Sequence, residues 1–162
     1  MPKKESSLEK LKKDYKTIRK KYNLPDFKNL NEDFNIEKVA ETETEYLIRE
    51  VRRHMGEKFS NYLRFLEAIL NPVNVPIFIF SIVKTIKPED RKRLTEVYKK
   101  LSKIEVYLIE LEIEFSDKKE ADFIKESFKT WQEIKKDLIE VIDVIKKSWD
   151  NKFEVNNKSY FG

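Results

Sequence analysis

The chain has 162 residues, of which 40% are hydrophobic and 40% charged, with a net charge of +4, no cysteine and two glycines. The lack of cysteine excludes disulfides, thiolate nucleophiles and cysteine-ligated metals. Because Gly56 is the only internal glycine, glycine-rich phosphate loops and nucleophile elbows are excluded as well. Apolar residues spaced three and four apart amid dense charge predict one all-α domain over residues 1–162.

The first predicted helix covers residues 6–22 and is basic and amphipathic. Residues 1–22 contain nine basic side chains against three acidic ones. The apolar stripe of this helix is narrow, so we expect the segment 1–22 to dock loosely. Its apolar positions are Leu8, Leu11, Tyr15, Ile18 and Tyr22.

After the first helix we expect one helical turn at residues 26–30, followed by an acidic stretch that crosses the bundle. A second long helix is expected to open at a capping box formed by Thr42 and Glu45 and to end near Leu70. Gly56 in its middle costs about 1 kcal/mol relative to alanine. Either a close helix crossing at that point compensates for this cost, or the helix simply tolerates it.

A short third helix is expected after Asn74, which would cap it, with Pro76 in its first turn. Residues 77–86 are apolar nearly all round, so this helix is predicted to be buried on several sides. The fourth helix should begin at residues 87–90. The fifth should be capped by Asp117 and Glu120.

The fourth and fifth helices carry the clearest periodicity in the chain. The apolar residues of the fourth repeat at intervals of three and four, an a/d heptad seam. They are Leu94, Val97, Leu101, Ile104, Leu108, Leu111 and Phe115. A similar stripe follows a short break at residues 116–117, which predicts a helical hairpin. We therefore expect an elongated antiparallel bundle of about five helices with a long C-terminal hairpin and a polar tail at residues 150–162.

Clusters of basic residues on three of the helices are candidates for polyanion binding. Most of the basic residues of the whole chain are lysines, which favours contact with phosphate over recognition of bases. The candidates are Lys10, Lys12, Lys13, Lys16, Arg19, Lys20, Lys21, Arg52, Arg53, Arg91, Lys92 and Arg93. The alternative is that these side chains pair with acids on neighbouring helices. For the first helix the expected partner is RNA or the chain's own acidic residues 29–50.

The remaining candidate residues are aromatic. Tyr98, Tyr107 and Phe123 lie off the main stripe and are predicted to contact a second subunit. Residues 84–103 carry eight bases and three acids, whereas residues 105–126 carry three bases and eight acids. Antiparallel pairing of two such helices would match opposite charges, which favours a homodimer.

No set of residues indicates catalysis or a bound cofactor. His54 is the only histidine. A di-iron site of the ferritin type needs a second histidine, so we expect no metal, no cofactor and no small-molecule substrate. The longest apolar run, residues 75–83, is too short to span a membrane, which takes about 20 residues. No signal peptide is recognisable. A cytoplasmic protein is expected.

Three stretches of the chain resemble an uncharacterised family of all-helical archaeal proteins. They are residues 24–34, which begin Leu-Pro-Asp-Phe, residues 62–72, which begin Tyr-Leu-Arg-Phe, and residues 149–162, which end Tyr-Phe-Gly. The resemblance covers nearly the whole chain. It implies an all-helical fold and an archaeal, cytosolic setting, and it implies no activity and no functional residue.

Because no catalytic or cofactor site is indicated, the sequence favours a non-catalytic interaction or assembly protein that associates with itself or with another protein. The alternative is an RNA- or ribosome-associated factor that binds the phosphate backbone through its lysine-rich helices.

Overall fold

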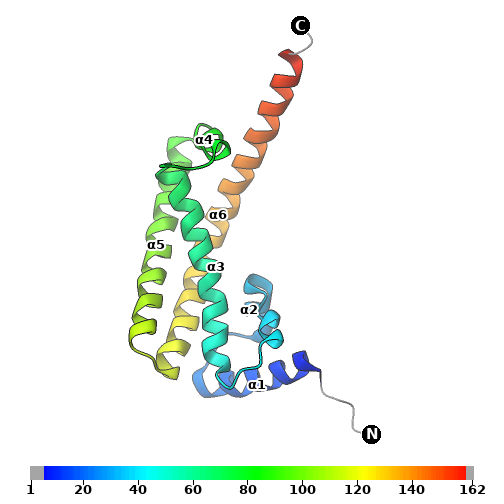
Figure 1. Cartoon of the computed structure of the whole chain (residues 1–162), viewed down its shortest axis with the longest axis vertical. Coiled ribbons are helices and arrows are strands. Elements are labelled where there is room, and N and C mark those ends of the chain that lie inside the picture. The colour runs from blue at the N-terminus through cyan, green and yellow to red at the C-terminus, as the bar shows by residue number, and fades with distance from the viewer. Residues whose placement is uncertain (1–5, 160–162) are drawn as a thin grey trace. The chain divides into compact units, whose positions relative to one another are not determined.

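The computed structural model describes the backbone of residues 6–159 and the side chains of residues 6–150. Within those residues there are seven helices and no strand, so the predicted all-α class is confirmed and the predicted number of helices is too low. In chain order (Figure 1) they are α1 (Ser7–Tyr22), α2 (Phe27–Phe34), the 3-10 helix η1 (Ile36–Glu41), α3 (Leu47–Leu70), α4 (Ile77–Val83), α5 (Pro88–Ile113) and α6 (Asp117–Ser159).

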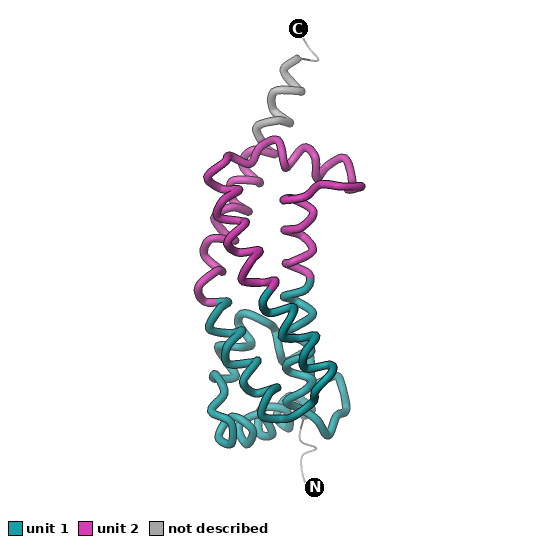
Figure 2. Tube along the Cα trace, turned by 90° about the vertical axis from the view of Figure 1, so that its left-hand side faces the viewer, with its two compact units in different colours: residues 1–60, 103–131 teal, residues 61–102, 132–162 magenta. Residues whose placement is uncertain are grey.

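The chain forms two compact units, which Figure 2 shows in different colours. Unit 1 comprises residues 1–60 and 103–131, and unit 2 comprises residues 61–102 and 132–162. Helices α3, α5 and α6 each contribute one segment to unit 1 and another segment to unit 2. The predicted elongated bundle concerns the arrangement of the whole chain and stays a prediction.

Helix α1 begins and ends where the sequence predicts. The Ser6 hydroxyl accepts a hydrogen bond from the Glu9 N–H at 3.2 Å and the Glu9 carboxylate accepts one from the Ser6 N–H at 3.1 Å, a complete capping box. The Tyr15 ring is fully buried and its hydroxyl donates to the Pro25 carbonyl at 2.7 Å. Burial raises the pKa of Tyr15, the nearby Arg19 guanidinium opposes that shift and the Asp26 carboxylate adds to it. The expected loose docking of residues 1–22 stays a prediction.

The segment after α1 is more helical than predicted. Helix α2 runs for eight residues instead of one turn and ends at Asn35, which adopts a left-handed conformation with φ of 54°. Asparagine is the residue that best replaces glycine at such a C-terminal position. The Asn31 side chain accepts from the Glu37 N–H at 2.9 Å, which links α2 to η1. Leu30 and Phe34, one turn apart, are both fully buried.

Both capping boxes predicted for the long helices are wrong. Helix α3 begins at Leu47, five residues after Thr42, and the Thr44 hydroxyl accepts from the Tyr46 N–H at 2.9 Å. At the start of α6 the Ser116 hydroxyl caps the Lys119 N–H at 3.1 Å. Glu120 instead pairs with the buried Arg52 of α3. A buried charge needs a partner, whereas an exposed helix N-terminus is also solvated by water.

Aromatic packing dominates the core of unit 1. The centroid of the Phe34 ring lies 5.2 Å from that of Phe59 and 5.8 Å from that of Trp131, and Phe59 and Trp131 are 6.1 Å apart. Of the two possibilities for Gly56, the close crossing is confirmed. A Cβ atom at this position would lie 2.8 Å from a terminal carbon of Leu108 on α5, so glycine permits the contact between α3 and α5.

The core of unit 2 follows the predicted seam. Leu94, Val97 and Leu101 of α5 are buried, as are Leu138 and Val141 of α6. Helix α6 continues to Ser159, so the polar segment predicted to follow residue 149 lies largely within this helix. Residues 160–162 fall outside the described residues.

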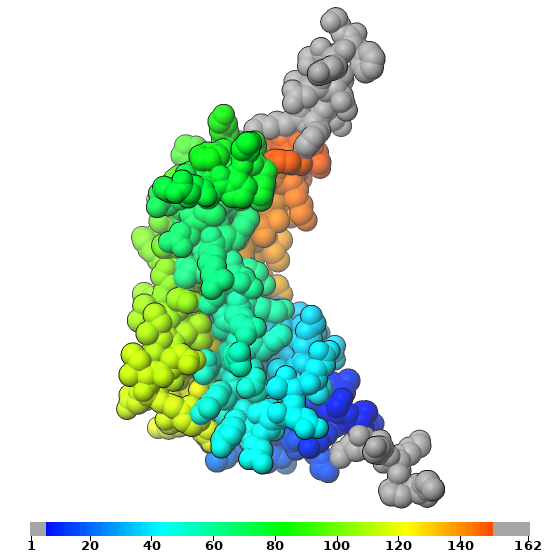
Figure 3. Space-filling model, in the orientation of Figure 1, coloured from blue at the N-terminus to red at the C-terminus, as the bar shows by residue number. Residues whose placement is uncertain are grey.

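Helix α4 departs most from the sequence-based prediction. Asn74 does not cap it but adopts a left-handed conformation with φ of 54°, and Pro76 occupies the N-cap position. Only Ile79 and Ile82 within α4 are buried. The side chain of Ile77 is 85% exposed. The predicted burial on several sides is therefore wrong, and in Figure 3 this bright green segment is visible at the surface.

Candidate interaction surfaces

Arg52, a predicted polyanion-binding residue, is buried and engaged by two carboxylates. Its Nε and Nη2 atoms donate to the two oxygens of Glu120 at 2.5 and 3.1 Å, and its Nη1 atom donates to Glu112 at 2.9 Å. Only 6% of Arg52 and none of Glu120 is exposed. The prediction for Arg52 is wrong because the guanidinium joins α3 to α5 and α6 inside unit 1, where no phosphate reaches it.

The pKa of Arg52 reflects these partners. Burial by itself lowers the pKa, but the hydrogen bonds and negative charge of Glu120, and then those of Glu112, raise it overall. The two parallel bonds to Glu120 form the fork geometry that arginine and carboxylate share. This cluster is therefore a structural tie within unit 1.

Two further arginines have partners near them. Arg53, next to Arg52 on α3, lies 3.5 Å from the Glu57 carboxylate one turn later, and both side chains are well exposed. Arg91 donates from Nη2 to the Leu70 carbonyl at 2.6 Å, which ties the start of α5 to the end of α3 in unit 2. Exposed pairs such as Arg53 and Glu57 contribute little to stability, so Arg53 stays a candidate for polyanion binding.

Arg93 pairs with two acids of α6 inside unit 2. Its Nη2 atom donates to Asp137 at 3.1 Å and to Glu140. The hydrogen bonds that Arg93 donates to Glu140 and then to Asp137 raise the pKa of Arg93. The neighbouring Lys92 is exposed. Arg93 thus follows the alternative in which basic residues pair with acids on adjacent helices.

Six of the candidate lysines lie on α1, and all six are exposed. They are Lys10, Lys12, Lys13, Lys16, Lys20 and Lys21. The Lys12 ammonium lies 5.8 Å from the centre of the Phe27 ring. Arg19 on the same helix forms an ion pair with Asp26 at 2.7 Å. The structure therefore brings these bases together on one helix surface.

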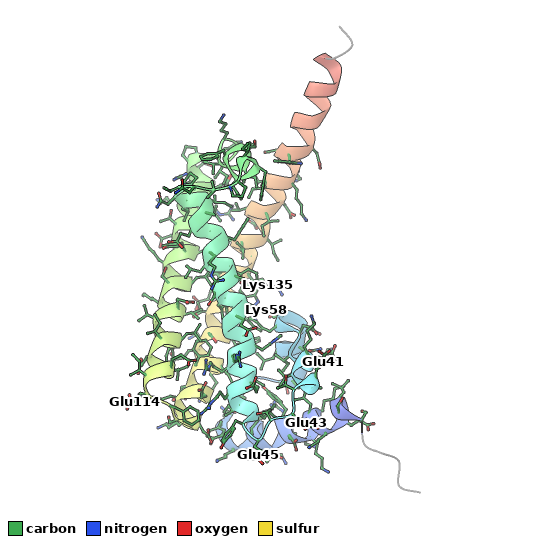
Figure 4. All side chains as sticks on the ribbon, in the orientation of Figure 1. Glu41, Glu43, Glu45, Lys58, Glu114 and Lys135 are labelled. Atoms are coloured by element: carbon green, nitrogen blue, oxygen red, sulfur yellow. The ribbon has the colours of Figure 1, made fainter. Side chains whose placement is uncertain are left out.

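Acidic residues border the N-terminal half of α1. Figure 4 labels Glu41, the last residue of η1, and Glu43 and Glu45, which lie between η1 and the start of α3. Glu43 and Glu45 line a groove in unit 1 together with Lys10 of α1. Helix α1 also contacts η1. The chain's own acidic segment, one of the two partners expected for α1, is thus its neighbour.

The three aromatic residues predicted to form an interface differ in their surroundings. Phe123 is fully buried, with its ring 5.4 Å from that of Tyr107 in an edge-to-face arrangement. Its assignment to an interface is wrong because α5 of its own unit covers it. Tyr107 is half-buried and donates to the Lys119 carbonyl at 3.4 Å. Tyr98 lines a shallow groove in unit 2 with Leu70.

Three large apolar side chains of unit 1 are exposed along α5. Val106, Ile109 and Ile113 are 66%, 55% and 82% exposed. Their spacing of three and four places them on one side of the helix. We call these three residues the α5 stripe. Contiguous apolar surface of this kind is typical of a site of interaction.

Glutamates surround the α5 stripe. Residues 104–116 contain four acids, Glu105, Glu110, Glu112 and Glu114, and no base. Lys119 of α6 pairs with Glu110 at 3.3 Å and with Glu114, which Figure 4 labels at the end of α5. Arg52 supplies the only other base paired with these four acids in the described part of the chain. Two bases are paired with these four acids, so the border of the stripe has a net negative charge.

The sequence contained a signal for the α5 stripe that the heptad pattern obscured. Helix α5 has two apolar faces, the seam in the core and a second row at positions 106, 109 and 113. The second row repeats at the same intervals of three and four but is offset from the seam. Such a second row, left over after the seam is assigned, predicts an apolar face outside the core.

His54 has a structural partner. Its Nε2 atom lies 2.9 Å from the Phe34 carbonyl oxygen. Because a carbonyl only accepts, this nitrogen carries the proton and donates, which satisfies a carbonyl at the end of α2. Among the side chains that the structure describes, no group of three or more histidines or acids is placed to hold a metal ion. The expected absence of a metal site stays a prediction.

Comparison with known protein families, with curated proteins and with solved structures found no match to this chain. The resemblance to an archaeal helical family therefore remains an expectation. Within residues 6–159, no helix is both long enough and apolar enough to cross a membrane.

Proposed function

We propose that this protein is a non-catalytic assembly protein of the cytoplasm that associates with copies of itself through the α5 stripe. The observation that supports this proposal is the exposure of Val106, Ile109 and Ile113 on a single face of α5. Burying one such side chain against a partner contributes about 1.5–3 kcal/mol. Three adjacent side chains thus supply the apolar centre that protein interfaces require.

The alternative partner is RNA, bound through α1. The exposure of the six α1 lysines on one helix surface supports this second candidate. Replacing Lys10, Lys16 and Lys20 together by glutamine should weaken RNA binding and reduce its dependence on salt, because each lost phosphate contact lowers the slope by about one. Electrophoretic mobility shifts at several salt concentrations measure this. Unchanged binding and slope would contradict the RNA proposal.

Replacing Ile109 by glutamine tests the assembly proposal. Glutamine preserves helix propensity and removes the apolar centre of the stripe. We expect the dissociation constant of self-association to rise about tenfold or more, corresponding to a loss of about 1.4 kcal/mol or more. Sedimentation equilibrium over a range of protein concentrations measures it.

Ile139→Gln is the matched control, because Ile139 is 48% exposed on α6 and Ile109 is 55% exposed on α5. This control should associate as the natural chain does. If Ile109→Gln and Ile139→Gln both leave association unchanged, the α5 stripe is not the interface.

A further inference from the structure

A second apolar surface lies in unit 2, around α4. Four side chains of this region are large, apolar and exposed, and we call them the α4 tip. They are Val73 (67%), Ile77 (85%), Phe78 (51%) and Phe80 (43%). Ile77 and Phe80 are three residues apart and share a face of α4. Lys84 follows Phe80 by four residues, in the helical conformation at the C-cap, and so lies near the same face.

The border of the α4 tip is basic. Residues 68–88 contain two lysines, Lys84 and Lys87, and no acid. Lys146 and Asp150 of α6 line a groove together with Phe78 and Ile82, so that three lysines and one acid border the α4 tip. The α4 tip is therefore an apolar surface edged by positive charge, whereas the α5 stripe is an apolar surface edged by negative charge.

Neither surface suits a second copy of itself. In an antiparallel contact between two α5 stripes, the four surrounding glutamates of one copy would approach those of the other. Two α4 tips would likewise bring lysines together. Like charges held close across an interface cost several kcal/mol. Two copies of α5 could instead pair in the antiparallel register that sets the basic residues 84–103 of one copy against the acidic residues 105–126 of the other. In that register the stripe would lie opposite residues 96–103, which are mostly polar.

We infer that the α4 tip of one copy docks on the α5 stripe of another copy. This inference rests on the self-association proposed above and identifies its second surface. Ile77 and Phe80 contact the apolar side chains of the stripe, and Lys84 lies beside Glu110 or Glu114. Because each copy then uses two different surfaces, the contact is heterologous. An open assembly retains a free α4 tip at one end and a free α5 stripe at the other unless it closes into a ring.

A mixing experiment tests this arrangement. One variant, Ile77→Gln with Phe80→Gln, loses the α4 tip. The other, Val106→Gln with Ile113→Gln, loses the α5 stripe. All four side chains are exposed, so both variants should fold, which circular dichroism checks. Each variant alone should sediment as a monomer of 19.6 kDa. An equimolar mixture should form a dimer with one chain of each variant, because each supplies the surface that the other lacks.

Several results would overturn the inference. If the natural chain associates but the mixture remains monomeric, the two surfaces do not bind each other. If the variant without the α4 tip associates as the natural chain does, the stripe pairs with some other surface and only the proposed function survives. If the natural chain itself never associates, the proposed function fails as well. Ile139→Gln again serves as the control.

Discussion

Replacing Arg52 by alanine is expected to lower the free energy of unfolding by about 3–5 kcal/mol. The substitution leaves the carboxylate of Glu120, which has no exposed surface, without its two hydrogen bonds from the guanidinium. Glu112 loses its bond from Nη1 as well. Chemical denaturation, followed by the loss of helical circular dichroism, measures the change.

Two further variants separate the cost of an unpaired charge from the loss of packing. Arg52→Met combined with Glu120→Leu removes both charges and should restore most of the lost stability, because well-packed apolar side chains replace buried ion pairs at little cost. Arg53→Ala, at the exposed neighbouring position, should change the free energy of unfolding by less than about 1 kcal/mol. If Arg53→Ala lowers the free energy of unfolding as much as Arg52→Ala does, the burial of the Arg52 cluster does not explain the lost stability.

Replacing Phe34 by alanine should have an effect of similar size, about 3–5 kcal/mol. Phe34 is fully buried and its ring lies beside those of Phe59 and Trp131. The substitution leaves a cavity at the centre of unit 1 and removes two aromatic contacts. Denaturant unfolding gives the loss, and the near-ultraviolet circular dichroism of the buried Trp131 should weaken.

Phe34→Leu should cost less than Phe34→Ala because it fills part of the same space. Ile139→Ala, at an exposed position, should have little effect. If Phe34→Ala costs no more than this surface variant, the aromatic cluster does not hold unit 1 together.

Local signals in the sequence predicted the elements whose ends depend on local contacts. Helix α1 has its capping box at Ser6 and its left-handed residue at Asn23, and its bounds are as predicted. The seam of α5 was predicted because its period is set by the helix itself. Its last predicted position, Phe115, is wrong, because it lies beyond the end of α5 and is 46% exposed. The chain has asparagine at the left-handed positions 23, 35 and 74 and only one internal glycine. After glycine, asparagine is among the residues that adopt this conformation most readily.

The errors concern residues whose role depends on distant partners. Glu120 matches a capping pattern in the sequence, but its carboxylate is used by Arg52, 68 positions earlier in the chain. Phe123 lies off the stripe, yet α5 covers it. The apolar run of α4 gave no indication that its neighbours would leave it exposed. Periodicity shows that a face is apolar and does not show whether the same chain covers it.

Association of copies of the chain is the central claim, and sedimentation equilibrium of the natural protein at low salt tests it most directly. The average mass should exceed the 19.6 kDa of one chain and rise with protein concentration. Added salt should lower the average mass, because it screens the contacts between lysines and glutamates. A mass equal to that of one chain at every concentration would contradict the account.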